Sequence, residues 1–279
     1  MPVIIAGVLN LTPDSFSDGG RFASLESAVA AGLAMAVAGA QWIDLGGEST
    51  RPFAAPVAEN EEIRRVVPVI ERLADLLDER ARISIDTYKA GTARAALAAG
   101  ATIVNDVSGG LLEPSILDEV ARAGAAVVLG HLRGLPATMM ENVSFQDVVA
   151  EVTLELGERV AAARSAGCGE IFADPGIGFG KKLEHNLRLL AALPELGDRL
   201  GVRIMVGVSR KRFIGDLTGR SVDQRVFGTA AAVAAAVLGG AAVVRVHEVE
   251  EMGDVVKVAE AIATARVAGK KHYNGDPHG

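Results

Sequence analysis

The chain has 279 residues, of which 49% are hydrophobic and 4% aromatic, and its net charge is −7. A chain of this length can bury one sizeable core, and none of its apolar runs is long enough to cross a bilayer. The acidic balance is unfavourable for binding nucleic acid, which needs a basic surface. The single cysteine, Cys168, excludes an intrachain disulfide and is typical of a reducing compartment. We therefore expect a cytoplasmic protein with neither nucleic acid nor membrane among its partners.

Eight short apolar runs predict β-strands. The runs are almost continuously apolar rather than alternating, which is the pattern of parallel strands buried on both faces. They lie near residues 3–9, 42–45, 83–85, 102–104, 126–129, 171–173, 203–208 and 242–246.

The segments between these runs carry apolar residues at steps of three and four, for example over 63–77 and 226–237. This spacing predicts helices with one core-facing stripe. Phe227 belongs to the second stripe, so we expect its ring to be buried. Pro68 lies inside the first stripe and predicts a kink or a turn there.

Eight strand–helix repeats predict an α/β fold, specifically a (β/α)8 barrel that spans residues 1–279 as a single domain. An open doubly wound sheet is the alternative. The barrel is favoured because the eighth unit closes the set without leaving an edge strand. The polar residues 270–279 predict a frayed tail.

In a barrel, the residues that follow the strands meet at one mouth. Each of the eight predicted strands is followed by at least one polar or charged side chain. Convergence of eight such groups predicts a binding site. The groups are Asn10, Asp44 with Glu48, Asp86, Asn105, His131, Asp174, Lys211, and Arg245 with His247.

Asp86, Asn105 and Asp174 follow buried strands, so their oxygens need hydrogen-bond donors. A heterocycle with ring N–H groups and an exocyclic amino group would supply those donors. Each residue could instead cap a helix or a neighbouring loop. We favour binding of such a ligand as the explanation for all three residues together.

Arg51, Lys211, Arg245 and His247 gather positive charge at the mouth of an acidic chain. Arginine and lysine bind phosphate oxygens, so this cluster indicates an anion such as a diphosphate. Salt bridges to the neighbouring aspartates are the alternative. Lys211 could also form a Schiff base, as lysines at barrel strand ends do.

Asn10 could provide one oxygen ligand for Mg2+, because a diphosphate and water would supply the others. Asp14 and Asp18 also offer oxygens, although they could equally shape a turn. His131 could line the mouth or bond a neighbour. His185 is expected to face solvent.

Seven motifs, in matching order over nearly the whole chain, resemble the dihydropteroate synthase family. The resemblance implies a homodimeric (β/α)8 transferase of folate biosynthesis. Such an enzyme uses Mg2+ to join 6-hydroxymethyl-7,8-dihydropterin diphosphate to 4-aminobenzoate, which gives dihydropteroate and diphosphate, and it is a sulfonamide target. The motifs span residues 7–20, 47–52, 84–87, 104–109, 174–179, 209–211 and 245–247.

The resemblance also implies roles for single residues. The catalytic group is Lys211, Arg245 and His247, and Asn10 is the metal ligand. The pterin and diphosphate site consists of Thr50, Asp86, Asn105, Asp174, Lys211, Arg245, Val246 and His247. The aminobenzoate site consists of Thr50, Arg51, Pro52, Phe179 and Ser209. The aniline nitrogen needs positioning more than deprotonation, so we expect no dedicated general base.

The chain departs from the family pattern at Phe53, where the family usually has glycine. We expect this ring to change the discrimination between aminobenzoate and sulfonamides. Three other functions stay open at this point. They are a pterin-dependent methyltransferase, a non-catalytic pterin-binding paralogue, and a barrel aldolase that uses Lys211.

Overall fold

The computed structural model describes residues 2–11, 20–49, 55–135, 137–141 and 143–273. Its strands are β1 (Ile4–Asn10), β2 (Trp42–Gly46), β3 (Arg82–Asp86), β4 (Ile103–Asp106), β5 (Ala126–Gly130), β6 (Glu170–Asp174), β7 (Arg203–Gly207) and β8 (Val243–Val246). All pair in parallel and in chain order, and β8 pairs with β1 to close the sheet. The (β/α)8 barrel is therefore confirmed, and the open doubly wound sheet is wrong. Each strand ends within two residues of its predicted limits.

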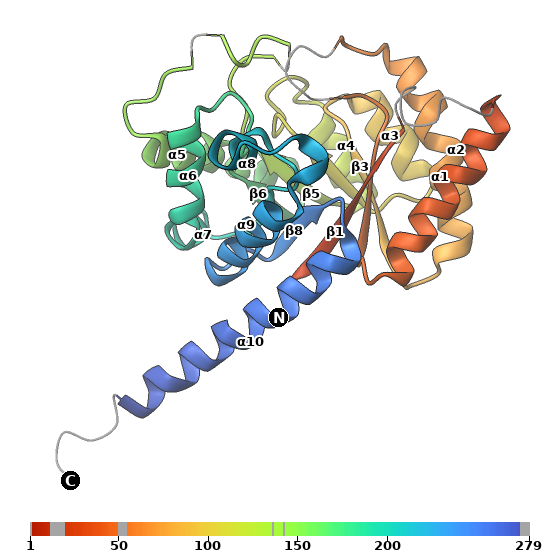
Figure 1. Ribbon diagram of the computed structural model, residues 1–279. Coiled ribbons are helices and arrows are strands. Elements are labelled where there is room, and N and C mark those ends of the chain that lie inside the picture. Colours follow the sequence, from red (N-terminus) through yellow and green to blue (C-terminus); the bar gives the residue numbers. More distant parts are fainter. Residues whose placement is uncertain (1, 12–19, 50–54, 136, 142, 274–279) are drawn as a thin grey trace.

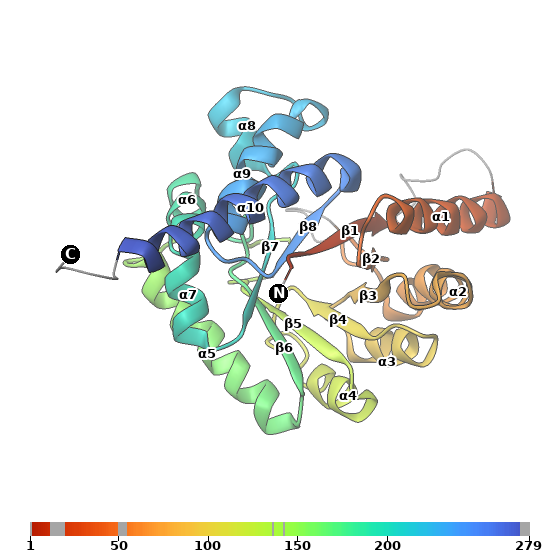
Figure 2. The same cartoon turned by 90° about the horizontal axis from the view of Figure 1, so that it is seen from below.

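The helices surround the ring of strands (Figures 1 and 2). They are α1 (Gly20–Val37), α2 (Glu59–Leu77), α3 (Ala90–Ala98), α4 (Ile116–Ala123), α5 (Val148–Ala166), α6 (Leu183–Ala191), α7 (Leu193–Leu200), α8 (Arg212–Thr218), α9 (Val226–Leu238) and α10 (Val249–Tyr273), with a short 3-10 turn at Val222–Gln224. The C-terminal part of α10 extends away from the barrel (Figure 1). No helix in the described ranges is both long and apolar enough to span a bilayer.

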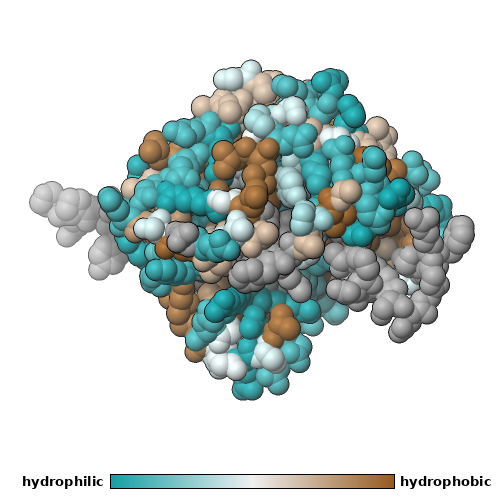
Figure 3. Space-filling model, turned by 90° about the horizontal axis from the view of Figure 1, so that it is seen from above, coloured by the Kyte–Doolittle hydropathy of each residue, from teal (hydrophilic) through white to brown (hydrophobic). Residues whose placement is uncertain are grey.

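Two layers of apolar side chains hold the barrel together. The inner one fills the bottom of the barrel, where the rings of Trp42 and Phe172 meet edge to face with their centroids 5.1 Å apart. The larger one lies between the strands and the helices. Because the bottom is closed by this apolar cluster, the inward-facing polar residues are left at the upper ends of the strands. That end of the barrel is mostly hydrophilic, with a few hydrophobic groups among the polar ones (Figure 3).

Some local predictions were wrong. No turn occurs at Pro68, because helix α2 continues through it and its buried stripe (Val66, Ile70 and Leu73) outweighs the lost backbone hydrogen bond; the alternative of a kink stays a prediction. Phe227 is 86% exposed, since the buried face of α9 runs through Thr229 and Val233 instead.

Two further segments differ from the prediction. The side chain of His185 is only 12% exposed, because its ring packs edge-on against Phe145. Helix α10 runs to Tyr273, four residues into the segment expected to be frayed, and the rest of that segment lies outside the described residues.

Candidate active site

Arg245 lies at the centre of the barrel mouth. From β8 its Nε donates to Asp44 Oδ2 at 2.5 Å, and its Nη2 donates to Asp86 Oδ2 at 2.7 Å. Asp44 is 2% exposed and also accepts hydrogen bonds from Ser84 Oγ at 2.6 Å and Asn105 Nδ2 at 3.1 Å. One hydrogen-bonded network thus joins the ends of four strands, β2, β3, β4 and β8.

The charges in this network are buried and therefore perturbed. Burial raises the pKa of Asp86 to about 7, with Arg245 opposing the shift and Asp44 adding to it. Burial would lower the pKa of Arg245, but the two aspartates together raise it. Arg245 is therefore a permanent cation that Asp44 and Asp86 share. Asp86, whose pKa is raised to about 7, can exchange a proton near neutral pH.

A second side of the mouth is formed by β6 and the loop that follows β7. Asp174 accepts a hydrogen bond from the backbone N–H of Gly176 at 2.7 Å, and burial raises its pKa. The Lys211 Nζ lies 3.9 Å from the centroid of the Phe179 ring, which is cation–π geometry. Gly207 separates Asp174 from Arg245, since a Cβ there would lie 3.9 Å from each side chain. Acidic, cationic and aromatic groups therefore face one another across the mouth.

These groups enclose a cavity of about 30 Å3. That is the volume of roughly one water molecule. A flat two-ring ligand could enter only after a side chain moved aside, and Arg245 and Lys211 are the long side chains in the lining. The lining includes Asp86, Asn105, Asp174, Phe179, Lys211 and Arg245.

Ser209 and His247 stand together at the rim between β7 and β8. The Ser209 Oγ lies 2.9 Å from His247 Nδ1, and it accepts a hydrogen bond from the His247 backbone N–H at 3.2 Å. Ser209 also donates to Glu248, which in turn pairs with Arg210. The Ser209 hydroxyl, which is expected to border the aminobenzoate site, therefore touches the His247 imidazole, which is expected to face the diphosphate.

Asn10 is the last residue of β1, and its side-chain oxygen faces the mouth. A Cβ at Gly46 would lie 3.7 Å from both Asn10 Oδ1 and Asp86 Oδ2, so these two oxygens flank the same point. No group of three histidine, cysteine or acidic side chains that could hold a metal ion occurs among the described residues. One amide oxygen fits a cation that takes its other ligands from phosphate and water, as Mg2+ does.

Glu48 lies at the centre of a buried ion-pair cluster. Its carboxylate binds the Lys89 ammonium, Tyr88 Oη at 2.9 Å and the Val57 backbone N–H at 3.2 Å. Lys89 also contacts Glu62 at 2.6 Å. Both carboxylate side chains are nearly inaccessible, at 6% and 1% exposure. The cluster joins the chain on both sides of residues 50–54.

Most of the predicted site residues meet at the mouth. These are Asn10, Asp86, Asn105, Asp174, Phe179, Ser209, Lys211, Arg245 and His247. Thr50, Arg51 and Pro52, together with Asp14, Asp18 and Phe53, lie outside the described residues. Val246 is an exception, because its side chain is fully buried in the layer between strands and helices, so only its backbone can face the mouth.

The buried aspartates and Asn105 have hydrogen-bond partners without a ligand, contrary to the prediction from the sequence. Among the described residues, no buried side-chain nitrogen or oxygen lacks a hydrogen-bond partner. The sequence predicts Asp44 at the mouth but assigns no chemistry to it or to Ser84, and both side chains complete the network. The signal was present, since each lies two residues before another inward-facing position on its strand, Gly46 and Asp86.

His131 does not line the mouth, because its side chain is completely buried behind it. The three glycines of the 174–180 loop have positive φ values and pack against the protein's own atoms. Their role is therefore to allow a tight backbone path.

The fold and the mouth together define a (β/α)8-barrel protein whose site combines buried hydrogen-bonding groups with a cluster of cations. The chain belongs to the pterin-binding enzyme family, whose model matches residues 6–247. A dihydropteroate synthase from Synechocystis is 46% identical over 261 residues, which are 92% of this chain and 89% of that protein.

Solved structures of dihydropteroate synthases have the same fold. The Yersinia pestis enzyme in a sulfonamide drug complex gives a TM-score of 0.87 at 40% identity, and the match covers 94% of this chain and 95% of that one. The Xanthomonas albilineans enzyme with 4-aminobenzoic acid gives 0.86 at 46% identity, with 94% and 93% covered. The resemblance found in the sequence is thereby confirmed.

Proposed function

We propose that this chain is the transferase that condenses 6-hydroxymethyl-7,8-dihydropterin diphosphate with 4-aminobenzoate, forming 7,8-dihydropteroate and diphosphate for folate biosynthesis. The observation that carries the proposal is the buried network around Arg245, with Asp174 and Lys211 opposite it in the same mouth. The relatives support it, since one solved structure from Xanthomonas albilineans is the synthase in complex with 7,8-dihydropteroate.

The pterin ring would bind among Asp86, Asn105 and Asp174. Its N–H and amino groups would replace the donors that these side chains now use, so Arg245 would leave Asp86 and stack on the ring. As the bond to the diphosphate breaks, positive charge develops on the pterin methylene. Two carboxylates fixed beside the ring stabilise that charge, because they need no reorientation during the reaction.

The leaving diphosphate gains negative charge, which Lys211, Arg245 and His247 would bind. Arginine can contact two phosphate oxygens at once, and lysine acts as a point charge. Ser209 contacts His247 at 2.9 Å, so it can hold the imidazole while it borders the aminobenzoate site. Ionic contacts that strengthen as the bond breaks lower the barrier.

The aniline nitrogen would attack the methylene carbon with its lone pair and lose its proton afterwards. Phe179 and Ser209 would position the aminobenzoate, together with Thr50, Arg51 and Pro52. Positioning is the main requirement, because a weakly basic amine is already unprotonated at neutral pH. No side chain is assigned as a general base.

Magnesium is the proposed metal, and Asn10 is its proposed protein ligand. The amide oxygen at the mouth beside Asp86 supports this assignment. The ion would supply electrostatic stabilisation of the leaving diphosphate. We expect an Asn10→Ala variant to need more Mg2+ for half-maximal activity, while its melting temperature stays close to that of the wild type.

The test of the function is product formation from the two substrates, with and without Mg2+, for the wild type and Lys211→Ala. We expect Mg2+-dependent dihydropteroate from the wild type and a large loss in the variant. Lys182→Ala is the control, because that lysine is exposed and outside the mouth. Tight pterin binding without product would instead indicate the non-catalytic paralogue or the methyltransferase, and competition by free diphosphate would separate these two. Borohydride trapping with a carbonyl substrate would detect the aldolase.

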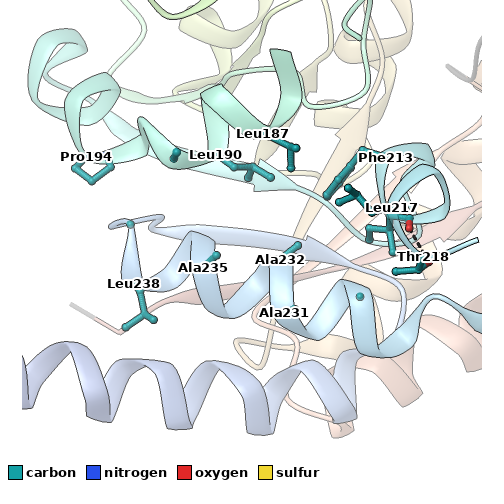
Figure 4. Close-up of a pocket in the computed structure, with 14 residues that line it drawn as sticks. Leu187, Leu190, Pro194, Phe213, Leu217, Thr218, Ala231, Ala232, Ala235 and Leu238 are labelled. Carbon is teal, nitrogen blue, oxygen red and sulfur yellow. Dashed lines mark hydrogen bonds between the residues drawn. The ribbon is translucent and has the colours of Figure 1, made fainter. Parts of the chain in front are cut away.

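We also propose that the protein is a homodimer in the cytoplasm. An apolar groove of about 640 Å3 between α6, α7, α8 and α9 supports the dimer (Figure 4). Leu187 and Leu217 line this groove and are 39% and 56% exposed, and Phe227 lies one helical turn from Ala231 on its wall. Sedimentation velocity of Leu217→Glu against the wild type tests the assembly, and cell fractionation tests the compartment.

A further inference from the structure

A second polar cluster lies directly behind the mouth, and the proposed chemistry does not use it. Its central group is the ammonium of Lys181, which is 3% exposed. The Nζ atom lies 2.9 Å from His131 Nδ1, 2.9 Å from the Phe179 carbonyl oxygen and 3.3 Å from the His131 carbonyl oxygen. Lysine has three N–H donors, so all three are directed to acceptors.

These contacts determine the state of the imidazole. Because His131 Nδ1 accepts from Lys181, its Nε2 carries the proton and donates to Glu155 Oε2 at 3.0 Å. Burial lowers the pKa of His131 to about 3, so the ring is neutral. The hydrogen bonds from His131 and Arg133 lower the pKa of Glu155 to about 2. A neutral histidine therefore separates a buried cation from a carboxylate that reaches the surface.

The cluster touches the mouth at Gly176. This residue has φ +69°, and a Cβ there would lie 1.9 Å from the His131 carbonyl oxygen and 3.1 Å from Lys181 Nζ. The backbone N–H of Gly176 donates to Asp174, and the Phe179 ring lies beneath Lys211. The ammonium thus lies behind two groups of the mouth, the Asp174 carboxylate and the backbone of Phe179.

The charges that face Lys181 come from three elements. They are Asp174 at the end of β6, Arg133 in the segment after β5, and Glu155 and Arg159 on α5. Burial lowers the pKa of Lys181 to about 7, and Asp174 is the largest influence that opposes the shift. Burial raises the pKa of Asp174, and the Gly176 backbone N–H, Lys211 and Lys181 oppose that shift, in that order. The two groups stabilise each other's charged form.

We propose that Lys181 is a positioning residue for the pterin end of the site. Its ammonium ties the loop after β5 to the loop after β6 beneath Gly176, whose backbone N–H binds Asp174, and it thereby holds that carboxyl group in place for the N–H groups of the pterin. The proposal rests on the proposed function, because it assigns Asp174 to the pterin. It gives Lys181 no contact with either substrate.

The first test compares Lys181→Met with Lys182→Met, the same change at the exposed neighbouring residue. Calorimetry measures the Kd of 6-hydroxymethyl-7,8-dihydropterin diphosphate in Mg2+, and thermal unfolding is followed in parallel. We expect the Kd to rise at least tenfold in Lys181→Met and to stay within twofold of the wild type in Lys182→Met. A Kd within twofold in Lys181→Met would overturn the proposal, whatever the change in melting temperature.

The second test removes the balancing carboxylate with Glu155→Gln, which keeps the size of a side chain that is 27% exposed. Without that charge Lys181 loses its proton, and with it one of the three N–H donors that tie the two loops, at a lower pH. The fall in pterin affinity on the alkaline side should therefore begin at a lower pH than in the wild type. The wild type and Glu155→Gln bind the same pterin diphosphate, so protonation of the ligand itself affects both profiles equally and cancels in the comparison. Superimposable profiles would overturn the proposal even if Lys181→Met did not fold. Failure of the proposed function is distinct, since the wild type would then bind pterin without forming product.

Discussion

Replacing Lys89 with methionine should strongly destabilise the protein. The variant leaves the carboxylates of Glu48 and Glu62 buried without the ammonium that both of them contact. Removing one partner of a buried ion pair costs about 3–5 kcal/mol. The entropy of unfolding is about 2.1 cal/mol/K per residue, and for 279 residues the total is roughly 0.6 kcal/mol/K. The melting temperature should therefore fall by about 5–9 °C.

The size of this loss should depend on pH in a defined direction. Burial raises the pKa of Glu62 above its ordinary value of 4.5 even with Lys89 present. Without Lys89 the pKa is raised further, so the folded variant binds more protons than the unfolded chain above pH 4.5. Its stability then decreases as the pH rises through that window. The deficit is therefore full at neutral pH and shrinks towards pH 4.5, where the Glu62 carboxyl group begins to be protonated in both states.

Thermal unfolding followed by circular dichroism at pH 7.5 and pH 4.5 measures both effects. Lys257→Met is the matched control, because Lys257 and Asp254 form a pair whose side chains are 78% and 81% exposed. Exposed pairs of this kind contribute about 0–1 kcal/mol. A Lys89→Met variant that melts as the control does at pH 7.5, or that shows the same deficit at both pH values, would refute the reasoning.

Three other variants test the mouth. Asp44→Asn should lower kcat/KM by about 10- to 150-fold in steady-state assays, because charged hydrogen bonds worth about 1.5–3 kcal/mol hold Arg245 and Asn105 in place. An unchanged kcat/KM would show that this network has no part in catalysis. Gly176→Ala should unfold at a lower temperature than Gly219→Ala, which has the same positive φ but no atom within 4 Å of the added Cβ. Phe53→Gly should change the aminobenzoate KM or the sulfonamide Ki, and constancy of both would exclude a role for this ring.

The strands and the residues at their ends could be predicted because each depends on local sequence. Asp86, Asn105 and Asp174 follow apolar runs directly, and a barrel brings such positions together. Salt bridges between the cations and the aspartates were the alternative that the sequence allowed, and Arg245 does form them. Which residues pair could not be predicted, since that depends on register and on side-chain reach. Arg245 contacts Asp44, which lies 201 positions earlier in the chain.

Other features needed the packed structure for a similar reason. The cluster around Lys89 joins residues 27 and 41 positions apart, and a pattern of hydrophobic residues carries no information about such ion pairs. Phe227 occurs at a helical spacing that fits either face of α9. Only the neighbouring elements decide which face is covered.

The complete internal pairing of the mouth has a consequence for selectivity. Ligand binding there exchanges hydrogen bonds that already exist, because the described buried polar side chains are already paired. A heterocycle that lacks one donor displaces an internal hydrogen bond of the mouth but forms no new one with the acceptor that is set free. Each such mismatch leaves a buried polar group unpaired, which costs about 1–3 kcal/mol, a factor of roughly 5 to 150 in affinity. Because the empty site is already satisfied, every ligand must break those internal hydrogen bonds to bind, whereas the discrimination between two ligands depends only on the hydrogen bonds made in the two complexes.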